Sequence, residues 1–124
     1  MNKEAYVSFE VAKLLKEKGF DWPCICYYED NGIIHRALDY VRQNDGDDDD
    51  NDECICPTQQ MACRWLRKEK GIHILPEISE VKENPKYYCM IWKTSTLESF
   101  IIELFDSYED AIEATLEYVL TNLI

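Results

Sequence analysis

Apolar residues recur at helical spacing in the segment 57–71, and this pattern predicts one complete helix. Pro57 suits a first helical turn, and the hydroxyl of Thr58 can cap that turn. Gly71 can adopt the left-handed conformation that ends a helix. We expect the apolar side of this helix to lie on a sheet, with Trp65 at its centre. The apolar side comprises Thr58, Met61, Ala62, Trp65 and Leu66, and the opposite side comprises Gln60, Arg64, Arg67 and Lys68.

Two further helices are predicted, one near each end of the sequence. Residues 8–18 follow the helical pattern, with Ser8 as the N-terminal cap and Gly19 at the end. The last helix begins at Asp106 or Ser107, because Ser107 and a carboxylate three residues later match a capping box. Acidic residues recur at every fourth position on the outer side of this last helix: Glu109, Glu113 and Glu117.

Runs of β-branched and aromatic residues predict strands between these helices. The predicted strands are 24–29, 33–36, 72–75, 87–94 and 98–105. The turn sequence Asp30-Asn31-Gly32 joins the first two strands as a hairpin, and Pro76 is expected to end the third strand. Segment 37–43 fits either a strand extension or one helical turn, and we favour a strand.

The order of these elements predicts an α+β fold, because helices and strands alternate without a regular βαβ repeat. About three helices are expected to pack on a small antiparallel or mixed sheet. The order is helix–strand–strand–helix–strand–strand–strand–helix. Residues 1–124 are expected to form a single domain. Residues 44–53 are expected to be an exposed acidic insertion loop within it.

The charge of the chain excludes one class of function. The formal net charge is −12, and seven of the 25 acidic residues lie between Asp45 and Glu53. A nucleic-acid interface spread over the whole surface is therefore not expected, because phosphate contacts require a cationic face. A basic protein is a better partner for such a chain.

Further features bear on the compartment of the protein. No apolar run approaches the 18 or more residues that span a bilayer, so no membrane partner is expected. The first 15 residues lack the pattern of a signal peptide. We therefore expect a cytoplasmic protein whose six cysteines are reduced.

The cysteines suggest one candidate metal site. Thiols at positions i and i+2 of a strand face the same way, so two such pairs could meet around Zn²⁺. The residues concerned are Cys24, Cys26, Cys54 and Cys56, with His35 and His73 as further ligands. The Cys-x-Cys spacing is a weak signal, since structural zinc sites commonly use Cys-x-x-Cys turns. The alternative is that these thiols are small buried side chains. We expect no cofactor.

Enzymatic chemistry is not indicated. Cys63 stands beside Arg64 and Arg67, which could make it an exposed and activated thiol. No sequence feature brings a histidine base to this thiol, as nucleophilic catalysis requires. The aspartate run does not match a calcium-binding loop, because Asp50 occupies the position of the required glycine.

Two charged stripes remain as candidate binding surfaces. One is basic and comprises Arg64, Arg67 and Lys68; the other is the acidic stripe of Glu109, Glu113 and Glu117. The ordinary interpretation of each stripe is a solvated helix face, and the alternative is a surface that binds a partner.

The segment PTQQMACRWLRKEKGIHI at 57–74 resembles a family of short proteins from Bacteroidales genomes and from their phages and prophages. VSFEVAKLLKEKGF near the start and SYEDAIEATLEYVLTNLI at the end fit the same pattern. The resemblance implies an accessory protein of a mobile element that acts in a bacterial cytoplasm. The aspartate-rich segment and both Cys-x-Cys pairs are peculiar to this member, so they imply no shared metal site.

The expected function is therefore non-enzymatic binding of another protein, with a basic target favoured by the acidity of the chain. A zinc- or thiol-dependent protein that uses the two Cys-x-Cys pairs is one alternative. Nucleic-acid binding through the basic stripe is another.

Overall fold

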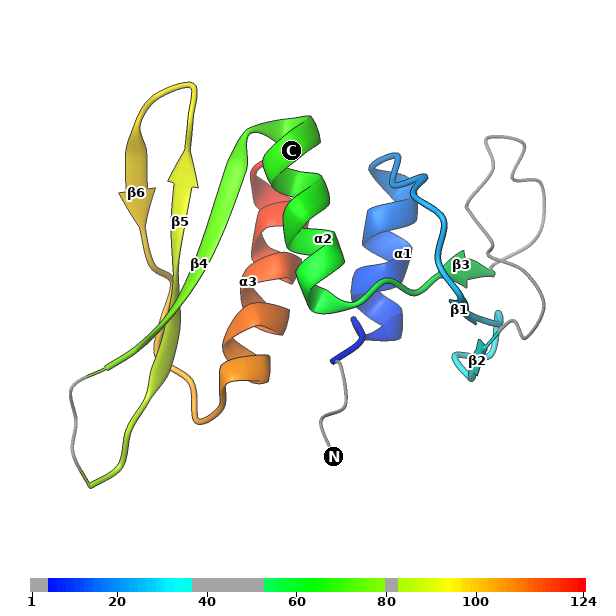
Figure 1. Cartoon of the computed structure of the whole chain (residues 1–124), viewed down its shortest axis with the longest axis horizontal. Helices are drawn as coiled ribbons and strands as arrows, with labels where there is room; N and C mark the ends of the chain where they lie inside the picture. Colours follow the sequence, from blue (N-terminus) through cyan, green and yellow to red (C-terminus); the bar gives the residue numbers. More distant parts are fainter. Residues whose placement is uncertain (1–4, 37–52, 80–82) are drawn as a thin grey trace.

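The computed structural model describes residues 5–36, 53–79 and 83–124 and shows an α+β fold. Within these residues, two antiparallel three-stranded sheets lie on opposite sides of three α-helices (Figure 1). The helices are α1 (Phe9–Glu17), α2 (Gln59–Trp65) and α3 (Tyr108–Asn122), and a π-helical turn, η1 (Leu66–Lys70), extends α2. The strands are β1 (Cys26–Tyr28), β2 (Ile34–Arg36), β3 (Cys54–Ile55), β4 (Ile72–Ile78), β5 (Tyr87–Lys93) and β6 (Glu98–Phe100).

The predicted α+β class is confirmed, but the strands form two sheets rather than one. The orders are β2-β1-β3 and β4-β5-β6. Strand β3 was not predicted, and it pairs with β1 across a long stretch of sequence, with Tyr28 opposite Cys54. The predicted strand 37–43 and most of the predicted acidic loop 44–53 lie outside the described residues.

The predicted N-terminal caps are confirmed. The hydroxyl of Ser8 accepts a hydrogen bond from the backbone N–H of Val11 (3.2 Å) at the start of α1. Thr58 caps α2 and Ser107 caps α3 in the same way, each accepting from the residue three positions later. These caps form locally, because a β-region residue with a short hydroxyl side chain satisfies an orphan N–H of the first turn.

The end of the central helix differs from the prediction, because its last turn is π-helical. Gly71 has the predicted left-handed conformation (φ 66°), and its N–H donates to the carbonyl of Leu66. The carbonyl of Gly71 accepts bonds from the N–H and the hydroxyl of Thr94, each at 3.0 Å. Trp65 is buried with its ring edge-on to that of Phe20. The centre of the apolar side thus contacts the segment that follows α1, which the sequence did not indicate.

The prediction that Pro76 ends a strand is wrong. Strand β4 continues to Ile78, and Pro76 pairs with Cys89 of β5. Proline is tolerated here because β4 is an edge strand of the sheet: within the described part of the chain, one of its two sides has no hydrogen-bonded strand. The additional residues of β4 carry the sheet past the start of α2.

The predicted strand 98–105 is broken after Phe100. Phe100 pairs with Ile91, and Phe105 forms a separate bridge to Tyr87. Ile91 and Tyr87 are four residues apart on β5, whereas their partners Phe100 and Phe105 are five residues apart. The extra residue interrupts the ladder as a bulge does, and Ile101 and Leu104 between the two bridges are exposed.

The hydrophobic core lies between the two sheets, around α3. One face of sheet β4-β5-β6 is buried against this helix through Ile74, Cys89 and Ile91. Helix α1 separates α3 from the small sheet (Figure 1). The opposite face of sheet β4-β5-β6 is turned away from all three helices (Figure 1).

Gly71 provides the first test of this fold. A Cβ at position 71 would lie 2.6 Å from the hydroxyl oxygen of Thr94 and would also need a left-handed backbone. We expect Gly71→Ala to lower the free energy of unfolding by roughly 2–3 kcal/mol. Gly19→Ala is the matched control, because Gly19 also has positive φ (97°) but no atom within 4 Å of its Cβ position. Urea denaturation showing equal losses for both variants would contradict the packing of Gly71 against Thr94.

Candidate functional site

The acidic stripe of α3 divides into exposed and bonded residues. Glu109 and Glu117 are exposed, as predicted for a solvated face. Glu113 is only partly exposed, because its Oε1 accepts the backbone N–H of Ser8 at 2.8 Å. Its Oε2 accepts the side-chain amide of Gln59 at 3.1 Å. Glu113 therefore links α3 to the first residues of both other helices, and it is not available as a free surface charge.

Gln59 is a structural residue that the sequence interpretation missed. Its side chain is 5% exposed. Besides Glu113, its amide N–H reaches the backbone carbonyl of Glu109 at 3.0 Å, and its backbone N–H donates to Ala5. The sequence places Gln59 next to a predicted N-terminal cap, but only the packing of α2 on α3 shows its partners.

The two Cys-x-Cys pairs lie near one another in and beside strands β1 and β3, and all four thiols are buried. The backbone N–H of Cys56 donates to the carbonyl of Cys26 at 2.9 Å. The thiols themselves have different contacts: Cys24 reaches the sulfur of Met61, and Cys56 reaches the carbonyl of Val7. Among the described residues, no group of three Cys, His, Asp or Glu side chains could hold a metal ion.

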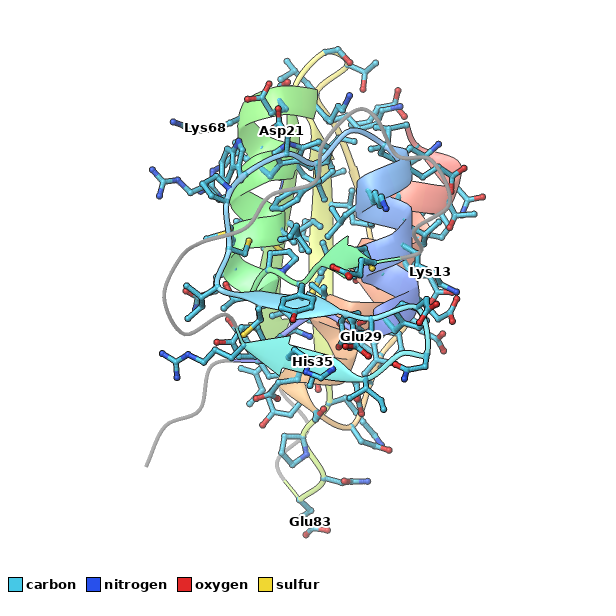
Figure 2. All side chains as sticks on the ribbon, turned by 90° about the vertical axis from the view of Figure 1, so that its right-hand side faces the viewer. Lys13, Asp21, Glu29, His35, Lys68 and Glu83 are labelled. Carbon is cyan, nitrogen blue, oxygen red and sulfur yellow. The ribbon has the colours of Figure 1, made fainter. Side chains whose placement is uncertain are left out.

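The two histidines lie in different sheets. His35 of β2 stacks on Tyr27, and its Nε2 lies 3.1 Å from Oε1 of Glu29 (Figure 2). His73 of β4 lies opposite Trp92 of β5. His73 is thus in a different sheet from the Cys-x-Cys pairs, whereas His35 of β2 shares a sheet with Cys26 and Cys54.

The interpretation of Cys63 as an activated thiol is wrong. Burial and, to a smaller extent, the neighbouring Cys89 raise the pKa of this thiol from 9.0 to about 12, although Arg67 lowers it. Burial likewise raises the pKa of Cys24 to about 11 and that of Cys56 to about 12. These three thiols are protonated at neutral pH, whereas nucleophilic catalysis requires a thiolate.

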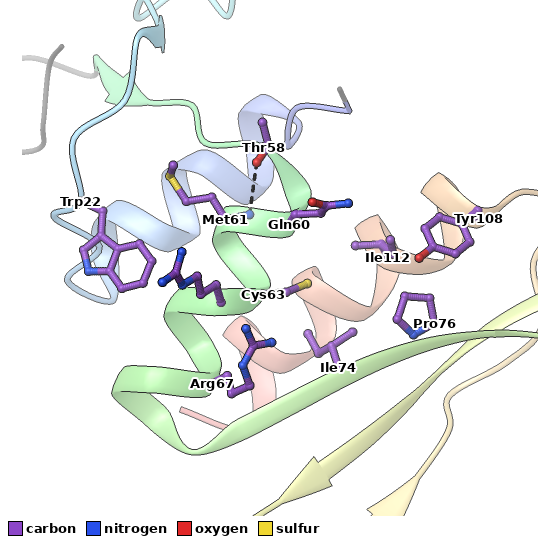
Figure 3. A pocket seen from close by; sticks show the side chains of 11 residues that line it. Trp22, Thr58, Gln60, Met61, Cys63, Arg67, Ile74, Pro76, Tyr108 and Ile112 are labelled. Atoms are coloured by element: carbon purple, nitrogen blue, oxygen red, sulfur yellow. Dashed lines mark hydrogen bonds between the residues drawn. The ribbon is translucent and has the colours of Figure 1, made fainter. Parts of the chain in front are cut away.

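The three residues of the basic stripe also lie in different surroundings. Arg64 and Arg67 line an open groove of about 490 Å³ between α2 and β4, whereas Lys68 does not line it (Figure 3). Lys68 points away from the body of the molecule (Figure 2). The predicted stripe assumes a spacing of 100° per residue. Arg67 and Lys68 do not follow this spacing, because the π-helical turn begins at Leu66.

The walls of the groove come from segments far apart in the sequence. Trp22 lies at one end and Tyr108 at the other, with Ile74 and Pro76 of β4 along one side (Figure 3). Sequence reasoning missed this groove because it ended the strand at Pro76. The only available signal was the apolar alternation before that proline.

A second unpredicted surface is the outer face of sheet β4-β5-β6. Residues of β4 and β5 that alternate with the buried Ile74 and Ile91 point away from α3. They form three cross-strand pairs: His73 with Trp92, Leu75 with Met90, and Glu77 with Tyr88. Leu75 is 45% exposed and Trp92 is 39% exposed. We call these six residues the open sheet face.

Comparison with protein-family models, with curated proteins and with solved structures finds no match to this chain. Among the described residues, no helix has the length and apolar character that crossing a bilayer requires.

The role of Glu113 can be tested by substitution. We expect Glu113→Ala to lower the free energy of unfolding by roughly 2–3 kcal/mol, because it removes two hydrogen bonds to a carboxylate and leaves the amide of Gln59 with one acceptor fewer. Glu117→Ala, one turn further along α3 and exposed, should change it by less than about 0.5 kcal/mol. Chemical denaturation of the two variants decides between them, and similar losses would show that Glu113 has no special role.

The thiols of Cys24 and Cys56, which are buried, and of Cys63, which is partly buried, predict a pH dependence of stability. Their pKa is higher in the folded protein than the ordinary value of 9.0, so the unfolded chain loses protons first as the pH rises. The stability they contribute is complete below pH 9 and declines between pH 9 and about pH 11–12. Each thiol adds a slope of roughly 1.4 kcal/mol per pH unit in that window.

The measurement is urea denaturation between pH 8 and pH 10.5 for the wild type and for Cys63→Ser. The serine hydroxyl does not titrate there, so this variant should lose stability less steeply as the pH rises. If the free energy of unfolding falls equally steeply with pH in both proteins, the pKa of Cys63 is not raised in the folded state.

Proposed function

We propose that this protein is a non-enzymatic binding module of a phage or prophage that acts in a bacterial cytoplasm. In this proposal it binds another protein through the open sheet face. The observation that supports it is the exposed apolar surface of a sheet whose other face is buried on α3. Soluble monomeric proteins rarely expose contiguous apolar patches larger than a few hundred Å², and larger patches commonly mark surfaces that bind a partner.

The composition of the open sheet face suits the centre of an interface. Tryptophan, tyrosine and methionine are enriched at such centres, whereas acidic residues and lysine are depleted. Trp92, Tyr88 and Met90 are successive outward residues of β5, and Leu75 of β4 extends them sideways. Glu77 is the acidic residue among the six.

Charge indicates what kind of protein would bind there. The chain carries a net charge of −12, and exposed carboxylates occur on β4, on β6 and just beyond β6, at Glu77, Glu98 and Glu103. A partner with apolar side chains surrounded by lysine or arginine would match both the face and its charged surroundings. Glu109 and Glu117 add to the negative field that attracts such a partner.

The two alternatives from the sequence have less support. A thiol-dependent function would need reactive thiols, yet burial raises the pKa of Cys24, Cys56 and Cys63. Nucleic-acid binding through Arg64, Arg67 and Lys68 would rely on three cations. The chain as a whole carries a net charge of −12, which opposes binding of a polyanion. A salt-dependent mobility shift with DNA or RNA would be needed to revive it.

The open sheet face can be tested by removing its apolar groups. We expect Leu75→Ser with Trp92→Ser to reduce capture of the partner from a Bacteroidales host lysate by at least about tenfold, because apolar and aromatic anchors carry most interface energy. Quantitative mass spectrometry of the captured proteins provides the measurement.

A matched control uses Ile33→Ser with Ile34→Ser, two exposed apolar residues of the β1–β2 hairpin region. This variant should retain the partner at wild-type levels. Thermal denaturation establishes that both double variants fold. Equal capture by wild type and the Leu75/Trp92 variant would reject the open sheet face as the docking surface.

A further inference from the structure

We propose that the groove between α2 and β4 is a binding site for a small organic anion with a flat apolar body, such as an aromatic carboxylate, sulfonate or phosphate. This site is separate from the open sheet face, because it lies on the helical side of β4. The groove combines apolar walls with two guanidinium groups (Figure 3).

The apolar walls are suited to a flat ligand. The indole of Trp22 closes one end, and Ile74 and Pro76 form the wall on β4 (Figure 3). Met61 of α2 and Ile112 of α3 contribute further apolar surface. Small-molecule sites are commonly concave and mostly apolar, with a few polar groups that fix orientation.

The two guanidinium groups supply the charge that selects an anion. Arg64 of α2 and Arg67 of the π-helical turn are three residues apart, and both line the groove. The ion pairs found among the described residues join Glu10 with Lys13, His35 with Glu29, and Lys86 with Asp106. Both guanidiniums are exposed and in none of these pairs, so they can bind a carboxylate, sulfonate or phosphate through paired N–H groups.

The other polar lining groups among the described residues are neutral. The hydroxyl of Tyr108 and the amide of Gln60 can donate hydrogen bonds at its edge. Burial raises the pKa of Cys63 to about 12, so this lining residue adds no negative charge at neutral pH. Among the described residues that line it, the groove thus offers an anion two positive groups and no opposing carboxylate.

The size of the site and the charge of the chain favour a small ligand over a polyanion. A volume of about 490 Å³ lies within the range of 300–1,000 Å³ found for small-molecule sites. A long acidic peptide or nucleic acid would extend beyond the two arginines and meet the field of a chain with a net charge of −12. A compact anion experiences this repulsion only through its own single or double charge.

The experiment titrates the full chain with 8-anilinonaphthalene-1-sulfonate, an aromatic sulfonate whose fluorescence rises on binding. Arg67→Gln should weaken its binding by at least about tenfold, because it removes a charged hydrogen bond. Lys68→Gln is the matched control: it removes one positive charge at the next residue, outside the groove, and should change binding by less than about twofold. Equal effects of the two substitutions would overturn the proposal, since they would indicate attraction to net charge alone.

The position of the dye is measured by methyl NMR. Shifts at Met61, Ile74 and Ile112 would support binding in the groove, whereas shifts confined to Leu75 and Met90 would overturn it by placing the dye on the open sheet face. The double variant of Leu75 and Trp92 should bind the dye as the wild type does. This variant separates the two proposals. If it loses capture of the partner but binds the dye as the wild type does, the open sheet face and the groove are independent sites.

Discussion

The carboxylate of Glu113 is the contact on which the arrangement of the three helices depends. One oxygen accepts the N–H of Ser8 at the start of α1, and the other accepts the amide of Gln59 at the start of α2. A negative charge is favourable at a helix N-terminus, where backbone N–H groups lack partners and the helix dipole is positive. Glu113 satisfies this preference at α1, through the backbone N–H of Ser8, and it contacts α2 through the side-chain amide of Gln59. It thereby connects both helices to α3. The groove and the open sheet face are then positioned by the elements that pack on this helix group.

The features of the fold that could be predicted from the sequence are those with local causes. The caps at Ser8, Thr58 and Ser107 formed where hydroxyl residues precede helical patterns, and Gly71 has the left-handed conformation expected of it. Strand β3 and the extension of β4 through Pro76 could not be predicted in this way. Both depend on partners distant in sequence, since a short strand or an edge proline is decided by the neighbouring strand and not by its own residues.

The same division applies to the candidate sites. The sequence correctly indicated which residues carry charge, yet it could not distinguish Glu113 from Glu117, which occupy equivalent positions on the helical pattern. Only the approach of α1 and α2 gives Glu113 its partners. In a similar way Arg67 and Lys68 are adjacent cations in sequence, and the position of β4 places only Arg67 on the groove. Cys63 was taken as exposed because its neighbours are arginines, whereas burial governs its pKa.

The open sheet face and the groove lie on the two sides of one edge strand, β4. Alternate residues of β4 point to opposite faces, so Leu75 joins the open sheet face while Ile74 and Pro76 line the groove. The strongly negative chain repels polyanions at distances beyond about 8–10 Å only weakly at physiological salt, because mobile ions screen the field. Within that distance the nearby guanidiniums of Arg64 and Arg67 outweigh more distant carboxylates, since Coulomb attraction falls with separation. A compact anion can therefore be held by the groove, while an extended polyanion also reaches other parts of a chain whose net charge is −12. The length of the anion therefore distinguishes small-ligand binding from nucleic-acid binding at the same two arginines.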